Sequence, residues 1–228
     1  MLEGLQPLLG LVLAGALGLV LLRQFQRNRA AAAASRGRLF GEVANLLAEP
    51  NFQAMPEPDH PILHGRFRGL PVQLRAVVDT LATRKLPSLW LMVTVPVPTG
   101  VGAVFDFMMR PASASTFSNY DQLPHIISAP AGWPPDGIAR SDNPLPLPAA
   151  ERLEPALKLL GNARAKEFLV TPQGVRFVVQ LAEADRARYG VFRQAEFGDV
   201  VVSKPFLAEV LTGMAEVIDN LRAERKAA

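Results

Sequence analysis

The sequence predicts an α+β fold: a single N-terminal transmembrane helix, followed by one soluble domain with a mainly antiparallel sheet and packed helices. Three observations predict it. Residues 4–22 carry no charged side chain. Residues 62–110 contain runs of β-prone residues bounded by glycine and proline, as strands do. Residues 152–223 read as a helix, a hairpin and a second helix, an order that favours an α+β fold over a parallel α/β fold.

The N-terminal apolar run is long enough to cross a lipid bilayer. As a helix, residues 4–22 rise about 28 Å, against a hydrocarbon core of about 30 Å. A soluble helix of this length would show a polar stripe, and this run has none. A signal peptide would place positive charge ahead of the run, where the charged residue is Glu3. We therefore expect residues 1–22 to form an uncleaved anchor.

The arginines after this run predict its orientation. Arg23, Arg27, Arg29, Arg36 and Arg38 follow it with no acidic residue among them. Because basic flanks are retained on the cytoplasmic side, we expect a single-pass protein of the bacterial inner membrane, with its N-terminus outside and its domain in the cytoplasm. The same arginines are expected to contact anionic lipid head groups.

Small residues recur at a spacing of four along the anchor. Gly10, Ala14 and Gly18 share one face of a helix, where small side chains allow close approach of a second membrane helix. This pattern predicts packing against another integral-membrane subunit. The alternative is that glycine and alanine are simply common in membrane helices and carry no packing role.

Composition excludes several function classes. The five arginines near the apolar run exceed the net charge of +3, so the remainder of the chain is slightly acidic, unlike a nucleic-acid-binding domain. The absence of cysteine excludes a thiolate nucleophile and a cysteine-ligated iron–sulfur cluster.

Three regions follow the anchor. Residues 23–48 contain good helix formers and no proline, and are expected to continue as a basic juxtamembrane helix or stalk. Residues 49–61 contain four prolines and are expected to be a linker. The α+β domain is expected to occupy residues 62–228, which are enough to bury a sizeable core.

The first half of this domain is expected to be β-structure. Residues 62–79 predict a hairpin with Gly65 and Gly69 near its turn. Residues 88–95 form a nearly continuous apolar strand, which favours a central position in the sheet. Residues 103–110 are expected to be its neighbour.

A proline-rich segment, residues 111–148, follows these strands. It contains eight prolines and is too long for a simple connection, so we expect a long ordered loop or surface flap. Tyr120 and Trp133 are its candidate partner-facing side chains. The alternative is that these aromatic residues anchor the loop to the domain.

The second half is expected to alternate helices and strands. Residues 152–160 predict a helix, and residues 166–182 predict a hairpin. One or two strands are expected in residues 191–203. An amphipathic helix is expected over residues 205–223, with Pro205 in its first turn.

Two groups of residues could carry chemistry. His60 and His64, beside Asp59, have the spacing of zinc ligands on a helix, but Pro61 disfavours a helix and no third ligand is evident. The second group combines carboxylates and arginines within residues 183–193. It could serve acid–base chemistry or phosphate binding, although such runs are more often solvated turns with local ion pairs. We expect no catalytic residue, no metal and no cofactor.

The sequence therefore favours a non-enzymatic, membrane-anchored accessory or scaffold subunit of a membrane protein complex, with its domain at the cytoplasmic face. A respiratory or photosynthetic complex is the expected host. The alternatives are a membrane-tethered enzyme, which would use the histidines or residues 183–193, and a small-molecule or lipid-binding domain with a pocket between the sheet and the C-terminal helix.

Overall fold

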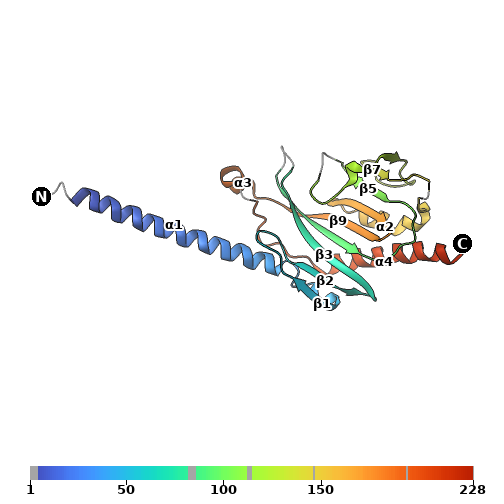
Figure 1. Cartoon of the computed structure of the whole chain (residues 1–228), viewed down its shortest axis with the longest axis horizontal. Coiled ribbons are helices and arrows are strands. Elements are labelled where there is room, and N and C mark those ends of the chain that lie inside the picture. The colour runs from blue at the N-terminus through green and yellow to red at the C-terminus, as the bar shows by residue number, and fades with distance from the viewer. Residues whose placement is uncertain (1–4, 82–85, 112–114, 146, 194, 228) are drawn as a thin grey trace.

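Nine strands form a single sheet, from which a long N-terminal helix projects (Figure 1). The computed structural model describes residues 5–81, 86–111, 115–145, 147–193 and 195–227; the side chains of residues 5–12, 28, 188, 191–192 and 224–227 also lie outside the description. The helices are α1 (Leu5–Arg38), α2 (Glu154–Leu160), α3 (Arg186–Phe192) and α4 (Lys204–Ala227), with short 3-10 helices at Ala44–Leu46, Tyr120–Gln122 and Ala150–Leu153. The strands are β1 (Ala48–Gln53), β2 (Ile62–Phe67), β3 (Leu70–Asp79), β4 (Ser88–Val95), β5 (Phe105–Met109), β6 (His125–Ile127), β7 (Gly137–Ser141), β8 (Ala165–Thr171) and β9 (Gly174–Glu183).

The strand order is β1-β2-β3-β4-β9-β8-β5-β7-β6, and every neighbouring pair is antiparallel. The prediction of an α+β fold with a mainly antiparallel sheet is confirmed. The strand predicted at 88–95 is β4, which lies between β3 and β9. The prediction that residues 103–110 neighbour it is wrong, because the β8–β9 hairpin lies between β4 and β5.

The β2–β3 hairpin turns through a tight two-residue loop. Arg68 and Gly69 both have positive φ, at 50° and 82°. Two successive residues with positive φ are typical of a type I′ turn, whose twist matches that of the flanking strands. The turn therefore sets the register in which Phe67 pairs with Leu70.

The main hydrophobic core lies between one face of the sheet and the helices α2 and α4. Leu91 of β4, Phe168 of β8 and Phe177 of β9 point into it and are almost completely buried. From α4, Leu211 and Met214 fill the same core, as the apolar stripe of this helix predicts.

The proline-rich segment 111–148 adds strands to the sheet. Its strands β6 and β7 extend the sheet beyond β5, at the edge opposite β1. Part of the same segment lies over the sheet face opposite the helices, where Phe117 and Tyr120 pack with Met108 and Val178 in a second, smaller apolar cluster.

Residues 39–47 join α1 to the domain. The long helix ends at Arg38, and Leu39, Phe40 and Val43 are buried in the main core. The next residues form β1, which pairs with β2, so the predicted linker 49–61 begins as an edge strand. The predicted stalk 23–48 is thus helical only to Arg38, because its last apolar residues are removed from water by the domain.

The expectation of a single transmembrane helix is not supported and is corrected. Within the part of the chain whose side chains are described, no helix is both long enough and apolar enough to cross a membrane. In α1 this part begins at Leu13, and its apolar stretch ends at Leu22. Such a stretch rises about 15 Å, half of the roughly 30 Å hydrocarbon core. The rest of the predicted anchor is residues 1–12: residues 1–4 lie outside the description, as do the side chains of residues 5–12.

The prediction of strands in residues 191–203 is also wrong. α3 extends to Phe192, and the described residues 195–203 contain no strand. Instead, the amide of Val202 donates to the carbonyl oxygen of Leu39 at 3.0 Å, so this extended segment pairs with the end of α1.

We predict that Phe40→Ala lowers the free energy of unfolding by about 3–5 kcal/mol, because it removes a fully buried aromatic side chain. The matched control is Phe25→Ala, which changes an aromatic residue that is 53% exposed on α1 and should leave the stability unchanged. Urea denaturation of both variants measures this difference. Equal stability of the two variants would contradict the placement of residues 39–47 in the core.

Candidate functional site

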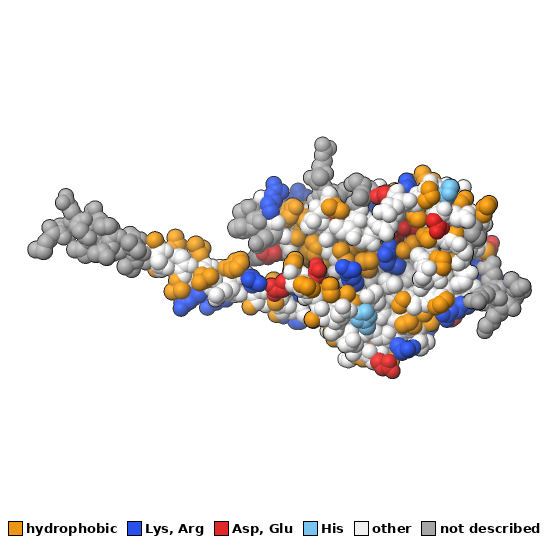
Figure 2. Space-filling view, viewed as in Figure 1, with side chains coloured by type: hydrophobic (Ala, Val, Ile, Leu, Met, Phe, Trp, Pro, Cys, Tyr) orange, Lys and Arg blue, Asp and Glu red, His pale blue; other side chains and the backbone are white. Residues whose placement is uncertain are grey.

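The described part of α1 concentrates exposed apolar side chains. The large ones are Leu13, Leu17, Leu19, Val20, Leu21, Leu22 and Phe25. Leu17 is 61% and Leu21 60% exposed, and Figure 2 shows apolar side chains along the projecting helix. Extended apolar surfaces on folded proteins mark sites of association with membranes or other proteins. Residues 13–25, the apolar segment, are therefore the candidate attachment site.

The predicted packing face falls on this helix. Ala14 is exposed, and a Cβ added at Gly18 would meet no atom within 4 Å. Gly10 lies among the residues whose side chains are not described. Packing of Gly10, Ala14 and Gly18 against a second helix stays a prediction.

The five arginines divide into two groups. Arg23 and Arg27 are exposed beside the apolar segment. Arg29, Arg36 and Arg38 instead form ion pairs with acidic residues of the domain. The sequence does not distinguish these five arginines, because all carry the same charge. In the fold, Arg29, Arg36 and Arg38 hold α1 against the domain, whereas Arg23 and Arg27 are exposed where lipid head groups could bind.

The docking contacts come from both sides of α1. Glu57 accepts hydrogen bonds from Arg29 Nη2 at 2.8 Å and from Arg36 Nη2 at 3.0 Å. Arg38 Nη2 donates to Asp199 Oδ1 at 2.5 Å. The hydrogen bond and charge of Arg29, followed by those of Arg36, lower the pKa of Glu57. Such exposed pairs contribute little stability, so their effect is to orient the helix.

His60 lies next to this junction and is 9% exposed. Its Nδ1 is buried and has no hydrogen-bond partner among the described residues. Burial is the main cause that lowers the pKa of His60; the charge of Arg36 acts in the same direction, and Asp59 opposes it. The imidazole is therefore neutral at neutral pH, and its protonation would place a second positive charge near Arg36.

The two histidines that were candidate metal ligands have different surroundings in the fold. His64 lies in β2, and its Nε2 is 3.1 Å from Gln53 Oε1 on β1. Among the described residues, no group of three or more histidine, cysteine, aspartate or glutamate side chains is placed to hold a metal ion.

The charged run 183–193 forms the short helix α3 and the residues before it. The carbonyl oxygen of Asp185 accepts a hydrogen bond from the Tyr189 amide at 2.9 Å. The guanidinium carbon of Arg193 lies 5.7 Å from the centre of the Tyr189 ring. The side chain of Arg188 lies outside the description. The amide of Asp185 also donates to the carbonyl oxygen of Glu196 at 2.8 Å, so the described contacts hold this run against the segment that follows α3.

Tyr120 and Trp133 are both buried. Trp133 packs edge-on against Phe107, with ring centres 4.8 Å apart. The hydroxyl of Tyr120 donates to the carbonyl oxygen of Ile138 at 3.2 Å, and Arg140 lies over its ring at 5.0 Å. Both aromatic residues thus hold segment 111–148 on the sheet, and neither is exposed to a partner in this structure.

A buried acidic pair was not found from the sequence. Glu167 on β8 is fully buried, and its Oε2 accepts hydrogen bonds from Arg176 Nε at 3.0 Å and Nη2 at 2.9 Å. Asp106 on β5 is 2% exposed, and its Oδ1 has no partner among the described residues. Burial, and then the charge of Glu167, raise the pKa of Asp106 well above its ordinary value, while Arg176 lowers it. The available signal was a single acid within an apolar strand, Phe105-Asp106-Phe107.

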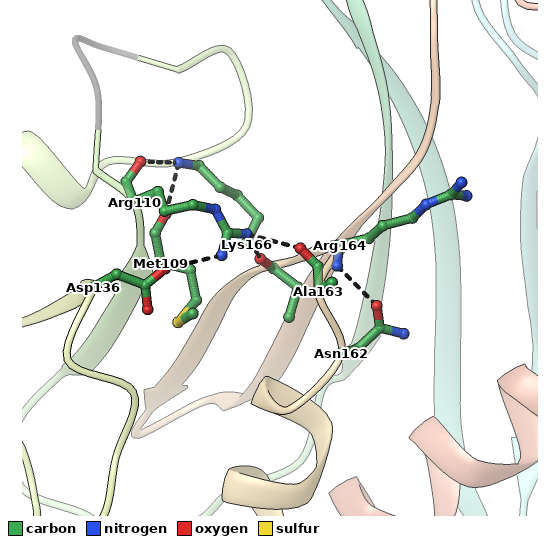
Figure 3. Close-up of polar contacts among 8 residues, drawn as sticks. Met109, Arg110, Asp136, Asn162, Ala163, Arg164 and Lys166 are labelled. Atoms are coloured by element: carbon green, nitrogen blue, oxygen red, sulfur yellow. Dashed lines mark hydrogen bonds and ion pairs between the residues drawn. The ribbon is translucent and has the colours of Figure 1, made fainter.

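A second polar cluster, the cationic clamp, joins the ends of β5 and β8 (Figure 3). Arg110 has a φ of 44°, and its guanidinium contacts Asp136 at 3.2 Å and the Ala165 carbonyl oxygen at 2.6 Å. Lys166 Nζ donates to the carbonyl oxygens of Met109 and Arg110 at 2.8 and 2.7 Å. The clamp satisfies backbone groups at the strand ends, which gives it a structural role.

A cavity of about 360 Å³ opens between α2, α4 and β9. Leu159, Phe177 and Val210 form its buried apolar floor, and Lys158 and Glu209 lie at its exposed rim. Its position is that of the pocket expected between the sheet and the C-terminal helix.

We predict that the free energy of unfolding decreases as the pH falls from about 7 to about 5. The unfolded chain, in which the histidine pKa is about 6.5, binds a proton that the buried His60 resists. His60→Gln should reduce this decrease. His64→Gln, which changes the ring that contacts Gln53, should retain it. Urea denaturation at several pH values measures the difference, and identical pH profiles of wild type and His60→Gln would contradict the assignment.

Comparisons with known proteins add little to this site. No protein-family model and no curated protein matches the chain. Among solved structures, the chain is similar to the crystal structure of the mycobacterial trehalose monomycolate transport factor A, TtfA, at 12% sequence identity over 72% of each chain, with a TM-score of 0.39. A similarity of this size carries no argument about function.

Proposed function

We propose that this protein is a non-enzymatic, membrane-associated accessory subunit that holds its α+β domain at the cytoplasmic face of the bacterial inner membrane. The observation that carries the proposal is the apolar segment 13–25, which α1 presents away from the domain. Burying a leucine side chain is worth about 1.5–3 kcal/mol, so several exposed leucines on one helix favour association with lipid or protein.

The attachment of α1 to the domain supports the same role. Residues 39–43 are anchored in the core, and ion pairs orient the helix from Arg29 to Arg38. A helix fixed in this way holds the domain at a set distance and direction from whatever binds its apolar segment. A flexible tether would not, which favours a scaffold that must present its domain to a host subunit.

The two exposed arginines support association with an anionic surface. Arg23 lies at the domain-proximal end of the apolar segment, and Arg27 follows that segment along the chain. Each arginine near an anionic lipid surface contributes about 1 kcal/mol, and the cytoplasmic leaflet is the anionic one.

A non-enzymatic role is favoured by how the candidate catalytic residues are used. His60 lies in the interior beside Arg36, and His64 pairs with Gln53. Within residues 183–193, the Asp185 amide donates to the carbonyl oxygen of Glu196 at 2.8 Å, and Arg193 lies against the Tyr189 ring, contacts that stabilise the local fold.

We expect the full chain to bind lipid vesicles through the apolar segment. Leu17→Gln/Leu21→Gln should weaken binding to all vesicles by more than tenfold, because two exposed leucines are lost. Arg23→Gln/Arg27→Gln should weaken binding about thirtyfold on phosphatidylglycerol vesicles and leave phosphatidylcholine vesicles unaffected. The control, Arg38→Gln, changes an arginine paired with Asp199 and should bind like wild type. Co-flotation measures all four, and unchanged binding of the leucine variant would refute the proposal.

The partner expected in the host complex is an integral-membrane subunit. Gly18→Leu fills the predicted packing face without any clash inside the chain. We expect this variant to reach the membrane but to lose its co-purifying subunits in mild detergent, whereas Ala16→Leu, away from that face, keeps them. If the Gly18→Leu variant kept its co-purifying subunits, the partner would be recognised by the domain and not by this face of α1.

The cavity between α2, α4 and β9 favours a second candidate function, binding of a small amphiphile. Its apolar floor and its oppositely charged rim residues suit a short apolar group carrying a charged head. Native mass spectrometry of protein extracted in mild detergent should then detect a bound molecule, with reduced occupancy in Lys158→Ala/Glu209→Ala. A ligand-free mass in the wild type would exclude this function.

A further inference from the structure

The segment 115–123, the flap, lies over the sheet face that the helices leave uncovered. Phe117 and Tyr120 of the flap pack with Met108 of β5 and Val178 of β9, and Trp90 of β4 lies against this cluster. The rings of Trp90 and Phe117 are 5.3 Å apart and tilted by 51°. Movement of the flap would therefore change the surroundings of the Trp90 ring, and with them its fluorescence.

One polar contact of the flap reaches the buried acidic pair. The hydroxyl of Ser118 donates a hydrogen bond to Oε1 of the buried Glu167 and accepts one from the Tyr120 amide at 3.1 Å. Arg176 of β9 donates to the other oxygen of Glu167. The ionised form of Glu167 is thus matched by a guanidinium on one side and by the flap on the other.

Asp106, on the neighbouring strand, has no such matching. The charged and titratable groups around it are Glu167 and Lys166 of β8, Arg176 of β9, Arg140 of β7, and Tyr120 and Asp121 of the flap. Arg176 is committed to Glu167. Arg140, which pairs with Asp106 across the sheet, donates through Nη1 to the carbonyl oxygens of Asp121 and Leu123, and its buried Nε has no hydrogen-bond partner among the described residues. A negative charge on Asp106 would therefore be buried, without a hydrogen bond to its Oδ1, near a second carboxylate that already binds the guanidinium of Arg176.

We propose that the flap is a pH-sensitive lid: it is closed while Asp106 is protonated, and it opens as the pH rises because ionised Asp106 is hydrated only when the flap lifts. Opening exposes the apolar surface formed by Trp90, Met92, Met108 and Val178. This lid is independent of the function proposed for α1, since none of its residues lies in α1.

The direction follows from linkage. Burial and the charge of Glu167 raise the pKa of Asp106 in the closed state, whereas a hydrated Asp106 has an ordinary pKa near 4. Between these two pKa values the open state binds fewer protons than the closed state. The opening equilibrium constant therefore rises up to tenfold per pH unit in this window and is constant above it.

The test uses Trp90 as a single fluorophore. In Trp133→Phe the other tryptophan, which lies in the main core, is removed. We expect the emission of Trp90 to shift to longer wavelength, and its quenching by acrylamide to rise, as the pH increases from 5 to 9. Asp106→Asn in the same background keeps the size of the side chain and should abolish the transition. A pH-independent signal, or a transition that persists in Asp106→Asn, would overturn the proposal.

A second measurement keeps the proposal testable if Trp133→Phe does not fold. Hydrogen exchange of the Tyr120 and Gln122 amides in the full wild-type chain, corrected for the intrinsic pH dependence, should accelerate with pH up to tenfold per unit. Asp106→Asn should remove this excess. Equal corrected rates across the pH range would overturn the lid, and circular dichroism at each pH identifies global unfolding.

Discussion

A nine-stranded antiparallel sheet has two faces to cover, and in this chain α2 and α4 pack on one of them. On that face, apolar stripes meet and form the main core. The other face is covered in part by the proline-rich segment, whose few apolar side chains make a much smaller cluster. Polar groups therefore complete this side, and the pair of Glu167 and Arg176 is buried with them. Such an ion pair adds little net stability, because the cost of removing its charges from water offsets their attraction.

The N-terminal region likewise contributes few side chains to the core. α1 contributes to the core only after it ends, through Leu39, Phe40 and Val43. The turns before Ser35 project from the domain, as Figure 1 shows, and their described side chains are exposed. Exposed ion pairs at Glu57 and Asp199 set the direction of the helix at little cost or gain in stability. Direction and exposure together make α1 a spacer that carries an apolar surface.

The sequence by itself determined the fold class and most local elements. Alternating and continuous apolar runs located the β2–β3 hairpin, β4 and the β8–β9 hairpin, because strand periodicity depends on which residues face the core. Pro205 and the stripe after it located α4 for the equivalent reason.

Only the tertiary structure decided which elements meet. β9 lies between β4 and β5, and residues 198–202 form hydrogen bonds with the end of α1 and with Leu39; neither depends on local propensity. The different uses of Arg27 and Arg36 arise because the fold brings Glu57 to one of them. Asp106 and Glu167 are ordinary acids in their own strands, and they become a strained pair only when β5 and β8 align. Periodicity encodes the face on which a side chain lies, whereas charge pairing depends on distances between segments remote in sequence.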